Sequence, residues 1–104
     1  MTFSGRVEDW KNYSKGNTHV FSAKKFDGTA WLEFIIKNGS PSSIEFDSIF
    51  DENEMQMSVS LNDRIENITT GKCIVNLNDC NEGKYKVTAA ANNAKNLSVQ
   101  FTFV

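Results

Sequence analysis

Residues 97–103 read Leu-Ser-Val-Gln-Phe-Thr-Phe, with an apolar side chain at every second position. Successive side chains of a β-strand point to opposite faces of a sheet, so this alternation predicts a strand with one buried and one solvated face. The same period recurs in residues 31–37, 44–50, 55–61 and 85–91. Because no stretch of ten residues keeps the apolar spacing of a helix, the chain is expected to be all-β.

Turn residues separate these segments and three weaker strand candidates, residues 3–7, 18–23 and 73–77. Seven or eight short strands at regular spacing predict a two-sheet antiparallel sandwich, and we expect residues 1–104 to form one domain. The turn signals are Lys15-Gly16-Asn17, Asp27-Gly28, Asn38-Gly39-Ser40-Pro41, Asn78-Asp79 and Asn92-Asn93.

The alternation also predicts which side chains form the core, since one face of each strand must be buried. The expected core residues are Leu32, Phe34, Ile36, Ile44, Phe46, Met57, Val59, Leu77, Val87, Phe101 and Phe103.

Composition narrows the range of partners. The chain has 104 residues, 39% of them hydrophobic and 12% aromatic, which is typical of a folded single domain. Its 11 basic and 13 acidic residues give a net charge of −2, which argues against nucleic-acid binding. No apolar run approaches the roughly 18 residues of a membrane span, so we expect no membrane insertion. We expect a monomer.

The segment from Leu77 through Gly83 to Tyr85 resembles the corner between two strands of an immunoglobulin-like domain. There a leucine ends one strand, a glycine turns the chain, and a tyrosine opens the next strand with its hydroxyl bonded to upstream main chain. Residues 88–103 resemble the closing hairpin of bacterial immunoglobulin-like (fibronectin type III-like) modules. The resemblance covers residues 72–104 and implies an immunoglobulin-like sandwich. It also implies a secreted or cell-envelope setting in a bacterium, with a signal peptide removed.

The two cysteines depart from the antibody-type pattern, because Cys73 and Cys80 both follow the two tryptophans. An even cysteine count in an extracellular chain favours a disulfide between them. Geometry argues the other way, since an extended strand would carry the chain about 13 Å from Cys73 by residue 77. We expect the disulfide, with two separate buried thiols as the alternative.

Catalytic chemistry finds little support. His19 is the single histidine, which argues against a nucleophile–base pair and excludes a multi-histidine zinc site. We read His19 as a partly exposed strand residue, and we expect no enzyme activity, no metal and no cofactor.

An acidic stretch could offer oxygen ligands to calcium, but its spacing departs from that of a calcium-binding loop. We interpret it as a solvated loop that protects a strand edge. It consists of Asp47, Asp51, Glu52 and Glu54, together with Asn53.

Three aromatic residues, Trp10, Tyr13 and Trp31, are candidates for a sugar-stacking platform. The alternative is that each covers part of the core, as aromatic residues do in small domains. Trp31 is the stronger candidate because it lies on the strand face opposite Leu32 and Phe34.

Three functional hypotheses follow. The leading one is a non-catalytic secreted or cell-envelope module that binds a protein or glycan or acts as a spacer. The second is a secreted peptidase inhibitor acting through loop tips at residues 64–71 or 92–96. The third is a carbohydrate-binding module that uses Trp31 and Trp10.

Overall fold

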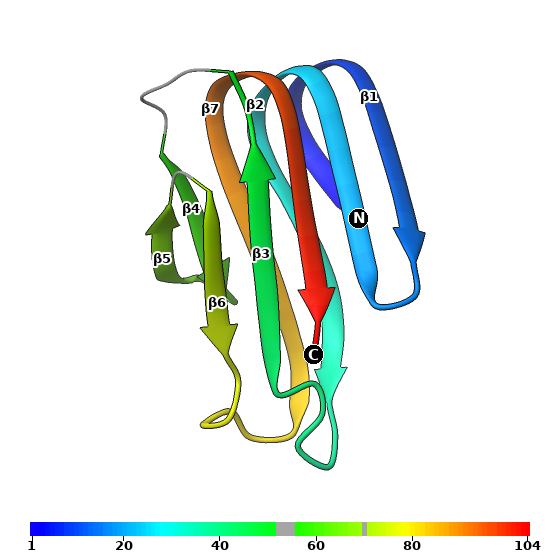
Figure 1. Ribbon diagram of the computed structural model, residues 1–104. Helices are drawn as coiled ribbons and strands as arrows, with labels where there is room; N and C mark the ends of the chain where they lie inside the picture. Colours follow the sequence, from blue (N-terminus) through cyan, green and yellow to red (C-terminus); the bar gives the residue numbers. More distant parts are fainter. Residues whose placement is uncertain (52–55, 70) are drawn as a thin grey trace.

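The computed structural model describes residues 1–51, 56–69 and 71–104. All regular secondary structure in these ranges is β-strand (Figure 1). The expectation of an all-β chain is therefore confirmed. The strands are β1 (Thr2–Lys15), β2 (Thr18–Ile36), β3 (Ser43–Ile49), β4 (Met57–Leu61), β5 (Arg64–Thr69), β6 (Lys72–Asn76) and β7 (Gly83–Phe103).

Hydrogen bonding connects these seven strands into one antiparallel sheet. At its centre β2 pairs with β7, and β1 pairs with the other side of β2. On its far side β7 pairs with β4 through its first part and with β3 through its last part. The sheet then continues from β4 to β5 and from β3 to β6.

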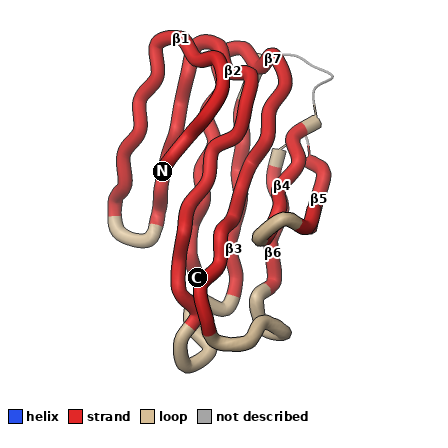
Figure 2. The backbone as a smooth tube through the Cα atoms, turned by 180° about the vertical axis from the view of Figure 1, so that it is seen from behind, coloured by secondary structure: helices blue, strands red, loops and turns tan. Residues whose placement is uncertain are grey.

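The three long strands β1, β2 and β7 arch over, so that the two ends of the sheet face each other (Figures 1 and 2). Irregular backbone marks each arch: φ is 51° at Asp9 in β1 and 55° at Asn93 in β7, and the β2–β7 register shifts between Phe26 and Gly28. Bulges and glycines are the usual means of bending a strand. The arches divide the sheet into two halves. The β3 half consists of β3, β6 and residues 10–15, 18–26 and 94–103. The β4 half consists of β4, β5 and residues 2–7, 28–36 and 83–91.

Two expected turns are therefore wrong. Asp27-Gly28 lies inside β2 and Asn92-Asn93 lies inside β7, at or beside the arches. Their turn-forming residues permit a bend in a continuous strand and do not end it. The other three signals do separate strands: residues 16–17 join β1 to β2, residues 38–41 join β2 to β3, and residues 78–79 lie between β6 and β7.

The core lies between the two halves. Aromatic contacts join them directly, with ring centroids 4.9 Å apart for Phe3 and Phe21 and 5.0 Å apart for Phe34 and Phe103. Most of the predicted core residues are buried, but Leu32, Phe34 and Phe103 are only partly buried against the cluster. The buried residues that the prediction left out include Phe21, Phe26, Val75, Leu97 and Val99.

The predicted disulfide is wrong: Cys73 and Cys80 are both free. Cys73 lies within β6 opposite Phe46, and the extended strand carries the chain away from it, as the spacing argument required. Cys80 lies in the following loop, where its amide donates to the Leu77 carbonyl at 3.0 Å. Burial raises the pKa of the Cys73 thiol, which keeps it protonated and weakly reactive at neutral pH.

Leu77, Gly83 and Tyr85 lie at the connection from β6 to β7. Leu77 is buried, and the half-buried Tyr85 stacks on Phe34 with ring centroids 5.9 Å apart. The Tyr85 hydroxyl donates to the main-chain carbonyl of Asn81 at 2.6 Å. This bond ties the loop after β6 to the beginning of β7, with upstream main chain as the acceptor.

We expect Tyr85→Phe to lower the free energy of unfolding by about 1 kcal/mol, the usual net value of one hydrogen bond. The bond is exposed, so water can replace the lost hydroxyl and the larger cost of a stranded buried acceptor does not apply. Urea denaturation measures the change. The matched control is Tyr13→Phe at a position that is 57% exposed, where no change is expected. Equal effects for the two variants would contradict the role given to this bond.

Candidate functional site

The outer face of the β4 half carries two neighbouring rows of mostly short side chains. Cross-strand partners share a face and lie about 5 Å apart, so the rows form a continuous surface. One row contains Ser4, Thr29, Ala90 and Ser58, and the next contains Thr2, Trp31, Thr88 and Ser60. We call the six hydroxyl-bearing residues of these rows, Thr2, Ser4, Thr29, Ser58, Ser60 and Thr88, the hydroxyl band.

A hollow of about 470 Å³ lies over this surface. It arises because short side chains form its floor while larger ones stand at its sides. The floor consists of Ser4, Thr29, Ser60, Thr88 and Ala90, and the sides consist of Trp31, Asn62, Asp63 and Lys86. We take this hollow as the candidate binding site.

Trp31 is held in place on this face by a charged neighbour. The Lys86 Nζ lies 5.3 Å from the centroid of the indole ring, within the range of a cation–π interaction. The two residues come from adjacent strands, since Trp31 pairs with Thr88 of β7. The ring is half-buried, so part of its surface stays available to a ligand.

Asn62 fixes the side of the hollow formed by the turn between β4 and β5. Its φ of 54° is left-handed, a conformation that asparagine tolerates. Its amide donates to the Lys86 carbonyl at 2.7 Å, and its Oδ1 accepts from the Lys86 amide at 2.9 Å. The turn is thereby anchored to β7. The alternating pattern did not single out this residue, although an Asn-Asp pair directly after an alternating segment indicates a turn.

The structure does not bring the three candidate aromatic residues together. Trp31 lines the hollow, whereas Trp10 packs against Phe3 with ring centroids 4.8 Å apart and is 50% exposed. Tyr13 lies on the β3 half, opposite Val20 in the register of β1 and β2. Trp10 thus covers part of the core, and of the three only Trp31 contributes to the candidate site.

His19 has a partner that the sequence analysis did not consider. The Ser14 hydroxyl lies 2.6 Å from the His19 Nδ1 across the β1–β2 hairpin, and the imidazole packs edge-on against Phe103. In a serine-hydrolase triad the serine bonds Nε2 while an acid holds Nδ1. Here the serine occupies Nδ1, so we interpret the pair as a cross-strand hydrogen bond.

His19 also gives the stability a dependence on pH. Burial lowers the pKa of His19 below its ordinary value of 6.5. The unfolded chain then binds the proton more readily than the folded one, so stability is full above about pH 6.5 and falls as the pH drops through the folded pKa. We expect urea midpoints between about pH 7.5 and 5.5 to fall more steeply for the wild type than for His19→Gln. Parallel curves would contradict this assignment.

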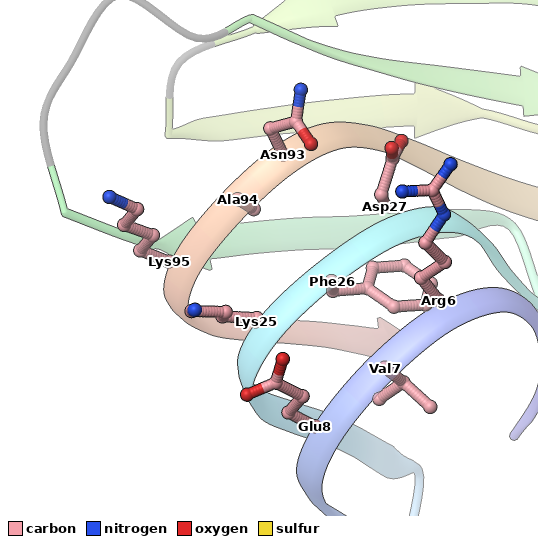
Figure 3. Close-up of a pocket in the computed structure, with 9 residues that line it drawn as sticks. All are labelled: Arg6, Val7, Glu8, Lys25, Phe26, Asp27, Asn93, Ala94 and Lys95. Atoms are coloured by element: carbon pink, nitrogen blue, oxygen red, sulfur yellow. The ribbon is translucent and has the colours of Figure 1, made fainter.

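A second hollow, of about 330 Å³, lies beside the arches of β1, β2 and β7 (Figure 3). Residues of opposite charge face each other along it, because Glu8 lies opposite Lys25 and Arg6 opposite Asp27 in the register of β1 and β2. Phe26 is buried beneath the arch at 2% exposure. This arrangement explains how polar side chains cover a sharp bend, and we assign it a structural role.

Three members of the acidic stretch, Glu52, Asn53 and Glu54, lie outside the described residues. Asp51 accepts a hydrogen bond from the Asn96 amide group at 2.6 Å. Within the described ranges, no three His, Cys, Asp or Glu side chains are grouped so that they could hold a metal ion. Nor does the described part of the chain contain a helix that is long and apolar enough to cross a membrane.

Of the two segments expected to be inhibitory loop tips, residues 64–71 begin with a strand, residue 70 lies outside the described residues, and residues 92–96 lie entirely within a strand. Residues 64–69 form the edge strand β5, and residues 92–96 continue β7 through its arch.

Comparison with known proteins adds no relative: no family model matches the chain, and neither the curated proteins nor the solved structures give a match.

Proposed function

We propose that this chain is a non-catalytic binding domain that holds its ligand on the outer face of the β4 half. The observation that carries the proposal is the hollow over the hydroxyl band, with Trp31 and Lys86 at its side. Binding sites combine a concave surface and an aromatic side chain with a few placed polar groups.

The rigidity of this surface supports recognition. Its floor residues lie on β1, β2, β4 and β7, which are paired with one another across the face. Sites on regular strands keep their geometry better than sites on loops, so less ordering is needed on binding. The anchored Asn62 and the cation–π contact of Trp31 add to this pre-organisation.

Arrays of glycans and of peptides, probed with wild-type protein and two matched variants, test the proposal. Ser60→Arg places a long side chain in the hollow. Ser22→Arg makes the same change on the β3 half, where Ser22 lies opposite Lys11 and Ser98. We expect at least one ligand class to bind the wild type and Ser22→Arg, and to lose binding to Ser60→Arg. Failure of both classes to bind, or equal binding by all three proteins, would refute the proposal.

We also propose that the domain is an immunoglobulin-like sandwich, distantly related to bacterial surface modules. The corner at Leu77, Gly83 and Tyr85 and the hydroxyl bond to Asn81 support this kinship. A secreted or cell-envelope location is part of the same proposal. It now rests on the resemblance of residues 72–104, because both thiols are free and the disulfide no longer supports it.

A further inference from the structure

The side chains around the hollow identify a class of ligand. We infer that it binds an uncharged oligosaccharide, laid across the strands with one sugar ring against Trp31. This inference rests on the proposed function and specifies the ligand of the same site.

The hydroxyl band suits a ligand that is itself covered with hydroxyl groups. Each serine or threonine can donate one hydrogen bond and accept others by rotating its hydroxyl, so the band can pair with sugar hydroxyls of either role. The rows run across β1, β2, β7 and β4. At about 4.8 Å between strands they extend about 14 Å, which is long enough for several sugar rings in succession.

Trp31 supplies a flat apolar surface, which the hydroxyl band lacks. A sugar ring has an apolar face of C–H groups, and an indole ring offers a flat apolar surface with a fixed orientation. Trp31 lies in the middle of its row, between Thr2 and Thr88. A ring stacked there has hydroxyl partners on both sides.

Charge at the site favours a neutral ligand. The hollow is lined by one ammonium group, on Lys86, and one carboxylate, on Asp63. The lining therefore carries no net charge, and a strongly anionic or cationic chain gains nothing from it overall. Both groups can still hydrogen-bond to sugar hydroxyls.

A peptide fits this site less well. Extended peptides bind sheets mainly by adding a strand to a free edge. The floor of the hollow is formed in its middle by β2 and β7, and each of these strands is paired on both sides. Their main-chain groups are therefore used within the sheet, and a ligand must be recognised by side chains.

Tryptophan fluorescence tests the inference directly, because the chain has only two tryptophans. In Trp10→Phe, Trp31 is the sole indole. We expect neutral hexasaccharides of glucose, xylose, mannose or N-acetylglucosamine to shift its emission saturably in at least one case. A hexasaccharide of galacturonic acid should not shift it. Trp31→Phe, which keeps Trp10, should show no shift with the same sugar.

Calorimetry with the sugar so identified provides the second measurement. Trp31→Ala should weaken binding about tenfold or more, as truncation of an aromatic anchor usually does. Thr88→Val, which removes one hydroxyl and keeps the shape, should weaken it about threefold or more. Trp10→Ala serves as the control and should bind like the wild type. Melting curves of all variants establish that they are folded.

The results separate this inference from the proposed function. No shift with any neutral sugar at millimolar concentration, binding of the acidic sugar alone, or unchanged binding by folded Trp31→Ala would overturn the inference. A peptide ligand whose binding is lost in Ser60→Arg would overturn it as well, while leaving the proposed function standing. Failure of both sugars and peptides to bind would overturn the two together.

Discussion

Phe101→Ala is expected to lower the free energy of unfolding by about 3–5 kcal/mol, the range for a fully buried phenylalanine. Phe101 is completely buried in the middle of the β3 half, between His19 of β2 and Phe46 of β3. Its ring packs against that of Phe46 with centroids 5.2 Å apart. Domains of this size are stable by about 5–15 kcal/mol, so the variant would lose a large part of its stability.

Phe34→Ala is the matched comparison for this prediction. Phe34 is partly buried at the edge of the core, where it contacts Tyr85 and Phe103. Because less apolar surface returns to water and the gap is open to solvent, its loss should be clearly smaller than that of Phe101. Urea denaturation of both variants gives the two values. Equal losses, or a smaller loss for Phe101→Ala, would show that the burial in β7 is misassigned.

Strands with strict alternation could be predicted well from the sequence. Residues 44–49 and 97–103 keep an apolar residue at nearly every second position, and they lie in β3 and β7 as expected. The pattern works there because each strand packs one face against the core along its whole length. Ile44 and Phe101 are accordingly both fully buried.

The long strands could not be predicted in the same way, because a bend interrupts the period. Val20 and Phe21 are adjacent in β2 and both buried, and the buried positions of the strand change from odd to even residue numbers between Ala23 and Phe26. A one-residue shift turns every later side chain to the opposite face. The apolar pattern in the sequence of β2 therefore predicts two short strands, and the residues of the arch are predicted as a turn between them.

The candidate site was predictable only in part. Trp31 could be singled out because its neighbours Leu32 and Phe34 fix the inward face of its own strand. The hydroxyl band was not visible, since Ser4, Thr29 and Ser60 come from strands far apart in the chain and meet only through the register. Trp10 was assigned to the same surface because composition identifies aromatic residues without showing which half of the sheet they occupy.

Gly28→Ala is expected to destabilise the fold strongly, although it adds only one methyl group. Gly28 of β2 lies directly opposite Gly5 of β1, at the point where both strands arch. A Cβ atom on Gly28 would overlap the main-chain carbonyl oxygen of Ser4 and lie 2.9 Å from the Cα of Gly5. Backbone cannot move aside as the end of a flexible side chain can, so the two strands must separate locally.

The expected loss of unfolding free energy is about 3 kcal/mol, at the upper end for overpacking. Gly71→Ala is the control, because an added Cβ there meets nothing within 4 Å. Its effect should be neutral or stabilising by a few tenths of a kcal/mol, since alanine restricts the unfolded chain. Amide exchange should also quicken in β1 near Ser4 in Gly28→Ala and stay unchanged in Gly71→Ala. An unchanged melting temperature for Gly28→Ala would contradict the close approach of β1 and β2 at the arch.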